Sequence, residues 1–406
     1  MKTIFRHFNI GLLAAAFLAL GTVAGFAQDP CADTAGIAAL DAKFRDNYAG
    51  DLAKRKMAVE AGKQYIEKYA SCEPSKEFVE YLNSYLPGME KAIKEEEEKA
   101  AMAIVLNRFN DGLKAKNWNE VYAAGKEVLA KKPDEYRDAE LVLGSIGLDE
   151  TAKSPRVTTW NDETLKYAKM AIADLEAGKT FKTFGVAPFK YKNKEDALGW
   201  MNYTIGYITY FDKNDKKGGL SYLYKATQLN SDTKSNPVVY ESIGAYYYDD
   251  VRRLAKEIQD LAAKQSPDNT EEQAKQLVSE INAKVGMVNG TAEAAIDAYA
   301  RAYSFAKKDP KTPKAYTDSL YKNLQDLYKV RFNKTEGFDA YIASTVNKPM
   351  PNPLNPIVPI NDAEPATAAT GDATPVTTKT EAPAAAKAAS GSKSAAVAKK
   401  PMKRKG

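Results

Sequence analysis

The chain has 406 residues, of which 44% are hydrophobic and 27% are charged. A chain of this length and hydrophobic content can form a large buried core. Its net charge of +5 comes from residues 1–27 and from residues 361–406, so the body between them is nearly neutral. A neutral body argues against a groove that follows the phosphates of a nucleic acid, and we expect no nucleic-acid partner.

Residues 1–27 have the pattern of a secretory signal peptide. Lys2 and Arg6 provide a basic start, residues 10–20 an apolar core, and residues 25–27 a small-residue cleavage site. The core is shorter than the roughly 20 residues of a membrane-spanning helix, and no later segment approaches that length without charges. A retained N-terminal anchor is the alternative. We expect an exported mature chain without a transmembrane segment, periplasmic or extracellular in a bacterium.

Cys31 and Cys72 are the only cysteines of the chain. In an oxidising compartment, a pair within one short region favours a disulfide, which here would join the ends of an N-terminal helical hairpin. Closing a loop of about 40 residues would restrict the unfolded chain by about 4 kcal/mol. Two unpaired thiols are the alternative.

The body, residues 28–345, is almost free of strand-like alternation, and we predict that it is all-α. Residues 156–193 have a weaker periodicity, which predicts an irregular connection or a short helix. Elsewhere proline and glycine occur at intervals that suit pairs of helices. The predicted breaks are Pro74, Pro87-Gly88, Pro133, Pro155, Gly185 with Pro188, Gly218-Gly219, Pro237, Pro267, Gly290, Pro310 and Pro313.

A helix-turn-helix pattern occurs three times along the body. In the first unit, two amphipathic stretches meet at Asn117-Trp118 and end at Pro133. The third unit is interrupted by a polar helical insertion at about 251–289. The positions that carry the pattern are Ile205, Gly206, Gly219, Leu223 and Ala226 in the second unit, and Ile243, Gly244, Tyr247, Ala295, Tyr299 and Ala302 in the third.

These units resemble divergent tetratricopeptide repeats. Trp118 occupies that family's aromatic turn position, Val121 and Val128 its two helix crossings, and Pro133 its closing proline. Gly125 departs from the pattern, because a large aromatic residue is usual there. The resemblance implies a right-handed solenoid of helical pairs that bury their apolar faces only against their neighbours. A plain helical bundle is the alternative, because small residues also occur at its helix crossings.

In such solenoids the first helix of each pair lines a concave groove, which implies a binding site for a protein or peptide. A tyrosine stripe suits this role, because tyrosine combines a large contact area with a hydroxyl donor. The alternative is that the stripe belongs to the core, where large aromatic side chains are common. The groove positions are Trp200, Tyr203, Tyr207 and Tyr210 in the second unit, Tyr248 and Asp249 in the third, and Asn110 and Lys114 in the first.

The composition argues against catalysis. His7 is the only histidine and leaves with the signal peptide, so the mature chain has no imidazole for a catalytic triad or for most zinc sites. The run Glu95–Glu98 is typical of a solvated helix face rather than of an acid-base pair. Residues 212–218 depart from a calcium loop, because Leu223 stands where a glutamate is required. We predict no enzyme activity, no cofactor and no metal site.

The end of the chain changes character. Residues 346–360 form a proline-rich linker whose sequence KPMPNPLNPIVP favours an extended conformation. Residues 361–406 are too poor in large apolar side chains to fold, which predicts a disordered basic tail. Such a tail suits an anionic cell-envelope polymer or lipid surface, and a simple spacer is the alternative.

Together these features predict an exported, non-enzymatic helical-repeat scaffold that binds a protein or peptide partner. The alternative is a structural envelope protein that self-associates without a dedicated groove, and an enzyme is the third hypothesis. A molecular mass that depends on concentration would favour self-association, whereas a saturable one-to-one partner would favour the scaffold.

Overall fold

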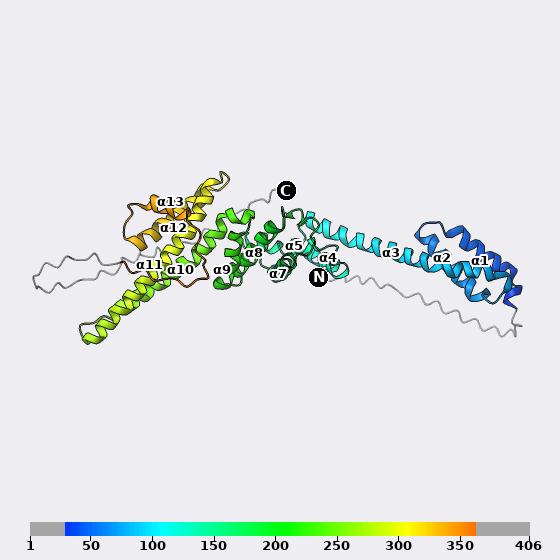
Figure 1. The fold of residues 1–406 in the computed structure, drawn as a ribbon, viewed down its shortest axis with the longest axis horizontal. Helices are drawn as coiled ribbons and strands as arrows, with labels where there is room; N and C mark the ends of the chain where they lie inside the picture. Colours follow the sequence, from blue (N-terminus) through cyan, green and yellow to red (C-terminus); the bar gives the residue numbers. More distant parts are fainter. Residues whose placement is uncertain (1–28, 363–406) are drawn as a thin grey trace, which may run out of the picture. The chain divides into compact units, whose positions relative to one another are not determined.

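The computed structural model describes residues 29–362, which are mostly helical, as the sequence predicts (Figure 1). The predicted signal peptide, including His7, and the tail after residue 362 lie outside the described residues. The chain divides into two compact units, Met1–Ile104 and Val105–Gly406, and the long helix α3 (Lys76–Ala115) contributes to both. The boundary falls inside residues 28–345, which we predicted from the sequence to be one domain.

From residue 29 onward, the first unit is built from three α-helices and two 3-10 helices. Asp33 and Asp51 accept hydrogen bonds from backbone amides of the first turns of α1 and α2, which fixes where these helices begin. Ion pairs between Arg55 and Glu96 and between Lys63 and Glu90 join α2 to α3. The elements are η1 (Pro30–Ala32), α1 (Thr34–Asn47), α2 (Leu52–Tyr69), η2 (Glu73–Ser75) and the first part of α3.

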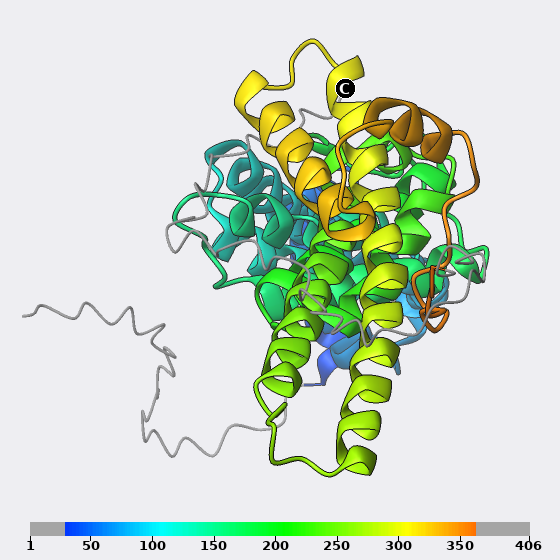
Figure 2. The same cartoon turned by 90° about the vertical axis from the view of Figure 1, so that its left-hand side faces the viewer.

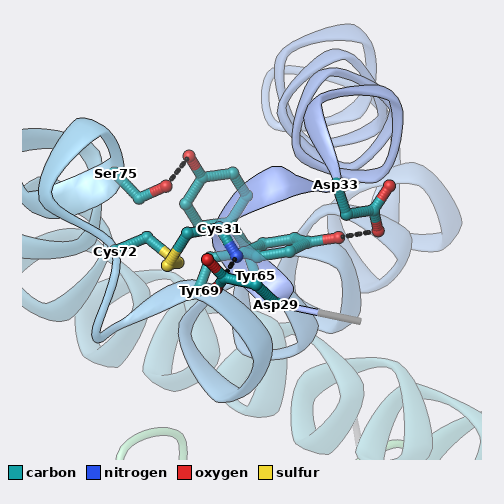
Figure 3. The surroundings of a disulfide bond; sticks show 7 residues. All are labelled: Asp29, Cys31, Asp33, Tyr65, Tyr69, Cys72 and Ser75. Carbon is teal, nitrogen blue, oxygen red and sulfur yellow. Dashed lines mark hydrogen bonds between the residues drawn. A yellow bond between two sulfur atoms is a disulfide. The ribbon is translucent and has the colours of Figure 1, made fainter. Parts of the chain in front are cut away.

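A disulfide links Cys31 in η1 to Cys72, which directly precedes η2 (Figure 3). Beside it, the Tyr69 hydroxyl donates a hydrogen bond to Asp33 Oδ2 at 2.7 Å. This bond, followed by the amide of Gly36, holds the pKa of Asp33 below its ordinary value. The bridge spans 41 residues of sequence, so it restricts the unfolded chain by about 4 kcal/mol on the entropic model.

The predicted break at Pro87-Gly88 is wrong, because α3 continues through both residues. Proline offers no amide hydrogen to the carbonyl of Asn83, one turn earlier. Asn83, Pro87 and Gly88 are all exposed, so water can bond that carbonyl and the helix persists. The predicted break at Gly290 is also wrong, because this residue lies inside α11 (Glu271–Lys308).

The second unit holds the end of α3 and the remaining elements of the described chain. Residues 156–193 contain a full helix and a short antiparallel β-hairpin, where the sequence predicted an irregular connection or a short helix. The elements are α4 (Trp118–Lys131), α5 (Asp138–Leu143), α6 (Ile146–Thr151), α7 (Asn161–Glu176), β1 (Gly185–Val186), β2 (Phe189–Lys190), α8 (Lys194–Phe211), α9 (Lys216–Gln228), η3 (Asp232–Ser235), α10 (Pro237–Ala262), α11, α12 (Lys314–Phe332) and α13 (Phe338–Val346).

Helices that follow one another in the second unit pack together. The pairs α8 with α9 and α10 with α11 are the most extensive, and Figure 2 shows α10 and α11 side by side as the long green and yellow helices. A Cβ on Gly206 would lie 2.8 Å from Leu223, and a Cβ on Gly244 would lie 2.7 Å from the ring of Tyr299. Glycine therefore lets the paired helices approach closely. Residues 251–289 form the far ends of α10 and α11 and the loop between them.

The core of the second unit is a continuous cluster of apolar and aromatic side chains from α5 to α13. Among the helices of residues 29–362, none combines the length and the apolar character that crossing a membrane requires.

Candidate functional site

The predicted aromatic stripe on α8 lies in the core of the second unit. Trp200, Tyr203 and Tyr210 are 7%, 6% and 4% exposed. Their rings pack against one another and against neighbouring helices, and the centroids of Trp200 and Tyr203 are 5.9 Å apart. Tyr207 is half-buried at the edge of the same cluster. This placement corresponds to the core alternative that the sequence left open, so the stripe does not offer a free groove surface.

The other groove positions lie at the surface or at its margin. Tyr248 is half-buried on α10 and has the Arg252 guanidinium 4.3 Å above its ring centroid. Asp249 is exposed and forms an ion pair with Lys216 of α9. On α3, Asn110 and Lys114 are both exposed, and Lys114 pairs with Asp111 at 3.2 Å. These side chains are engaged locally and do not converge on one ligand position.

A different surface of the second unit already holds a stretch of chain that forms neither helix nor strand and makes one turn, in which the Asn355 amide donates to the Asn352 carbonyl at 3.1 Å. Residues 348–362, which we call the segment, follow α13 and run beside α10 and α11 (Figure 1, orange). The side of the helices that receives it, which we call the cradle, is formed by Tyr247 of α10, by Gly286, Asn289 and Gly290 of α11, and by Arg331 of α12.

Close to its end, the segment is held through the backbone of one residue. The amide of Ile360 donates to the carbonyl of Gly286 at 2.9 Å, and the Asn289 side-chain amide donates to the carbonyl of Ile360 at 3.0 Å. Both backbone polar groups of Ile360 are thus satisfied by α11. Such contacts are independent of the side chain at this position, so the cradle recognises an extended backbone here.

Two glycines one helical turn apart make this approach possible. A Cβ on Gly290 would lie within 3.0 Å of the Val358 carbonyl and of the Ile357 side chain, a separation that real Cβ atoms essentially never show. A Cβ on Gly286 would lie 2.4 Å from Oδ1 of Asn361, the far end of a side chain that can move. The lack of a side chain at Gly290 therefore lets the segment lie directly against the backbone of α11.

Side chains of the cradle hold the segment at two further positions. Pro353 is buried, and its carbonyl accepts a hydrogen bond from the Tyr247 hydroxyl at 3.3 Å. At its end, the Arg331 guanidinium donates to the two carboxylate oxygens of Asp362 at 2.9 and 3.1 Å. The same guanidinium donates to Glu293 at 2.8 Å. Because the Arg331 side chain is only 6% exposed, its charge is matched by these two carboxylates rather than by bulk water.

The segment places apolar side chains on the protein as well. Met350 and Ile357 are half-buried and pack against the core cluster of the second unit. Leu354 and Val358, by contrast, are 55% and 74% exposed. The segment is therefore a stretch of chain bound to the helices, with one side buried and the other exposed, whereas the sequence predicted a linker.

The cradle gives a direct prediction. We expect Gly290→Ala to displace the segment, because the new methyl group overlaps the Val358 carbonyl. Cleavage by a protease that cuts at exposed apolar residues should accelerate at Ile357 and Val358 by about tenfold, which corresponds to a loss of about 1.4 kcal/mol. Digestion followed by mass spectrometry measures this.

The matched control for this prediction is Gly88→Ala. Gly88 also lies inside a long helix, but a Cβ there would meet nothing within 4 Å. Both substitutions raise helix propensity by about 0.5–1 kcal/mol, so they differ only in the overlap with the segment. Unchanged cleavage at Ile357 in Gly290→Ala would contradict the assigned role of the glycine.

A second polar cluster surrounds α5 and serves a structural purpose. The Asp138 carboxylate accepts hydrogen bonds from the backbone amides of Lys182 and Gly185 at 3.0 and 2.9 Å, which fixes the β-hairpin. Arg137 donates to Asp174 of α7 at 3.0 Å. Glu140 is 1% exposed, and its Oε2 has no hydrogen-bond partner within the described residues. Burial, with a smaller contribution from Asp174, raises the pKa of Glu140 to about 7.

Between residues 29 and 362, no three His, Cys, Asp or Glu side chains come together in a way that could hold a metal ion. An open cavity of about 290 Å³ lies between α12 and α13 and is lined by Tyr321, Tyr328, Phe338 and Asp339 among others. Its aromatic rings pack on one another, with centroids 5.3 Å apart for Tyr321 and Phe338. It is part of the contact between these two helices.

Sequence reasoning missed the residues of the cradle. Gly286 and Gly290 fall in the stretch that it assigned to an insertion and a break, although their spacing of four residues does place them on one side of a helix. That spacing was the available signal. Arg331 and Asp362 gave no such signal, because single charges far apart in sequence do not reveal that they form a pair.

Comparison with protein-family models, with curated proteins and with solved structures finds no match for the chain.

Proposed function

We propose that the chain is an exported, non-enzymatic helical-repeat scaffold that holds a protein or peptide partner through the cradle on α10, α11 and α12. The observation that carries this proposal is the seating of residues 348–362, a proline-containing stretch without helix or strand that is bound by backbone and side-chain contacts. A surface that satisfies both backbone polar groups of an extended chain is suited to receive a partner segment of the same kind.

A tetratricopeptide-like solenoid is the architecture that we propose for the second unit. It is supported by successive helix pairs that pack on their neighbours and by the close crossings at Gly206 and Gly244. In this architecture the partner contacts a side of the helices that is away from the aromatic stripe, since that stripe is buried.

Export and surface attachment complete the proposal. The disulfide between Cys31 and Cys72 supports export, because such bonds persist in oxidising compartments. The basic tail that the sequence predicts for residues 361–406 would supply lysine and arginine charges to an anionic envelope polymer or lipid surface.

Crosslinking of the purified full chain in a cell-envelope extract, with the crosslinked residues located by mass spectrometry, tests the function. We expect crosslinks from another protein to residues on α10, α11 and α12, and we expect fewer of them in Gly290→Ala than in Gly88→Ala. Crosslinks only between copies of the chain would refute the scaffold and favour the self-associating structural protein.

A further inference from the structure

We infer that the cradle accepts, from a separate molecule, a peptide without helix or strand that carries a proline, an apolar residue four positions later and an acidic residue nine positions after the proline, and that residues 348–362 are an internal occupant that such a partner must displace. This inference rests on the proposed function, because it names the class of partner for the same surface. It adds the requirement that the partner compete with part of the protein itself.

The spacing follows from the three side chains of the segment that the protein holds. Pro353 is buried and lies beside the Tyr247 hydroxyl. Ile357 packs on the core cluster, next to Gly290. Asp362 is paired through both carboxylate oxygens with Arg331. Between these anchors Leu354 and Val358 are exposed and Ile360 is held through its backbone, so these positions tolerate variation.

The acidic position is the most selective of the three. Arg331 has a buried guanidinium, and Glu293, its other carboxylate partner, is itself 33% exposed. Losing the second carboxylate leaves a buried charge with one partner, and a basic residue there adds repulsion between like charges. A bidentate pair also requires the planar arrangement that a carboxylate provides, so an amide at this position is a poor substitute.

The internal segment has a large advantage over a free peptide. It is connected to α13, which ends at Val346, only two residues before the segment begins. A tether of this length gives an effective concentration of the order of millimolar, so a free peptide with the same contacts competes poorly. A partner therefore needs additional contacts, or the internal segment must be weakened first. The apparent affinity for a partner is reduced in proportion to the fraction of protein in which the cradle is open.

The test uses the full chain carrying Asp362→Arg, which weakens the internal segment and leaves every residue of the cradle unchanged. The probe is a fluorescent synthetic peptide with the natural sequence of residues 349–362, and its binding is followed by anisotropy. We expect the variant to bind this peptide at least about tenfold more tightly than the unaltered chain does. We expect a peptide with Asp362→Asn to bind the variant about tenfold more weakly than the natural peptide.

Two controls keep the test decisive. Asp268→Arg makes the same charge change at an exposed residue in the loop between α10 and α11, and it should bind the peptide no better than the unaltered chain. A second variant combines Asp362→Arg with Ile357→Arg, which removes two of the three anchors, and proteolysis at Val358 verifies that the segment has opened. A segment that stays protected in this double variant would overturn the assignment of the anchors.

The outcomes separate this inference from the function that it rests on. If the segment opens and the peptide does not bind, the cradle does not accept a peptide from another molecule, and the inference fails. The proposed scaffold would still stand in that case if a partner protein crosslinks to the helices of the second unit. If the peptide does not bind and no partner crosslinks form, the inference and the proposed function are both contradicted.

Discussion

Replacing Tyr203 with alanine is expected to lower the free energy of unfolding by about 3–5 kcal/mol, with little effect on any surface for a partner. The Tyr203 side chain is 6% exposed and lies between Trp200 and Tyr207, with ring centroids 5.9 and 5.7 Å away. Removing the ring leaves a cavity in a cluster of large side chains that cannot easily collapse. Urea unfolding followed by circular dichroism measures the change.

Tyr224→Ala is the matched control for this substitution. Tyr224 lies on α9, the helix that pairs with α8, and it is only half-buried. Its removal should cost about 1 kcal/mol. If Tyr203→Ala were as stable as the unaltered chain and had lost its partner, the stripe would be a groove and its assignment to the core would be wrong.

Replacing Glu140 with glutamine is expected to stabilise the protein at pH 8 by up to about 3 kcal/mol. Burial raises the pKa of this carboxyl from its ordinary 4.5 to about 7 in the folded protein. Between these two pH values the unfolded chain loses the proton and the folded chain keeps it, so the free energy of unfolding falls as the pH rises from about 4.5 to 7. Glutamine has a similar shape and cannot ionise, so the variant avoids this loss.

Unfolding by urea at pH 5 and at pH 8 measures this pH dependence. At pH 5 the variant and the unaltered chain should differ by less than about 1 kcal/mol, because the Glu140 carboxyl is mostly protonated in the folded protein. Glu176→Gln, on α7, is the control, because Glu176 pairs with Lys225 where both side chains are 48% exposed. A Glu140→Gln variant that is less stable at pH 8 than the unaltered chain would show that the ionised carboxylate is well solvated.

Local sequence patterns were sufficient to predict the helical class and most of the helix ends. Asn117, before Trp118, accepts a hydrogen bond from the Glu120 amide and begins α4, and Pro237 opens α10. Capping residues and prolines act within one turn of helix, so their effect can be predicted without knowing the fold. Pro87 shows the limit of this reasoning, because the carbonyl of Asn83 that it leaves unpaired is exposed to water and the helix continues.

The candidate site could not be predicted in the same way, because its position depends on tertiary contacts. A tyrosine every three or four residues indicates one side of a helix, but not whether that side faces a groove or a neighbouring helix. For Tyr203 and Tyr210 it faces the core. The segment posed the opposite difficulty, because its prolines indicated a stretch without helix and gave no information about Gly286 or Arg331, which bind it.

Hydrogen exchange at the amide of Ile360 in the unaltered full chain tests the central claim, that the helices of the second unit hold an extended segment. The account predicts that this amide exchanges at least about tenfold more slowly than the same amide in a free peptide of residues 349–362, because it donates to the Gly286 carbonyl at 2.9 Å. Equal exchange rates in the protein and in the free peptide would mean that the segment is not held, and they would contradict both the cradle and the function proposed for it.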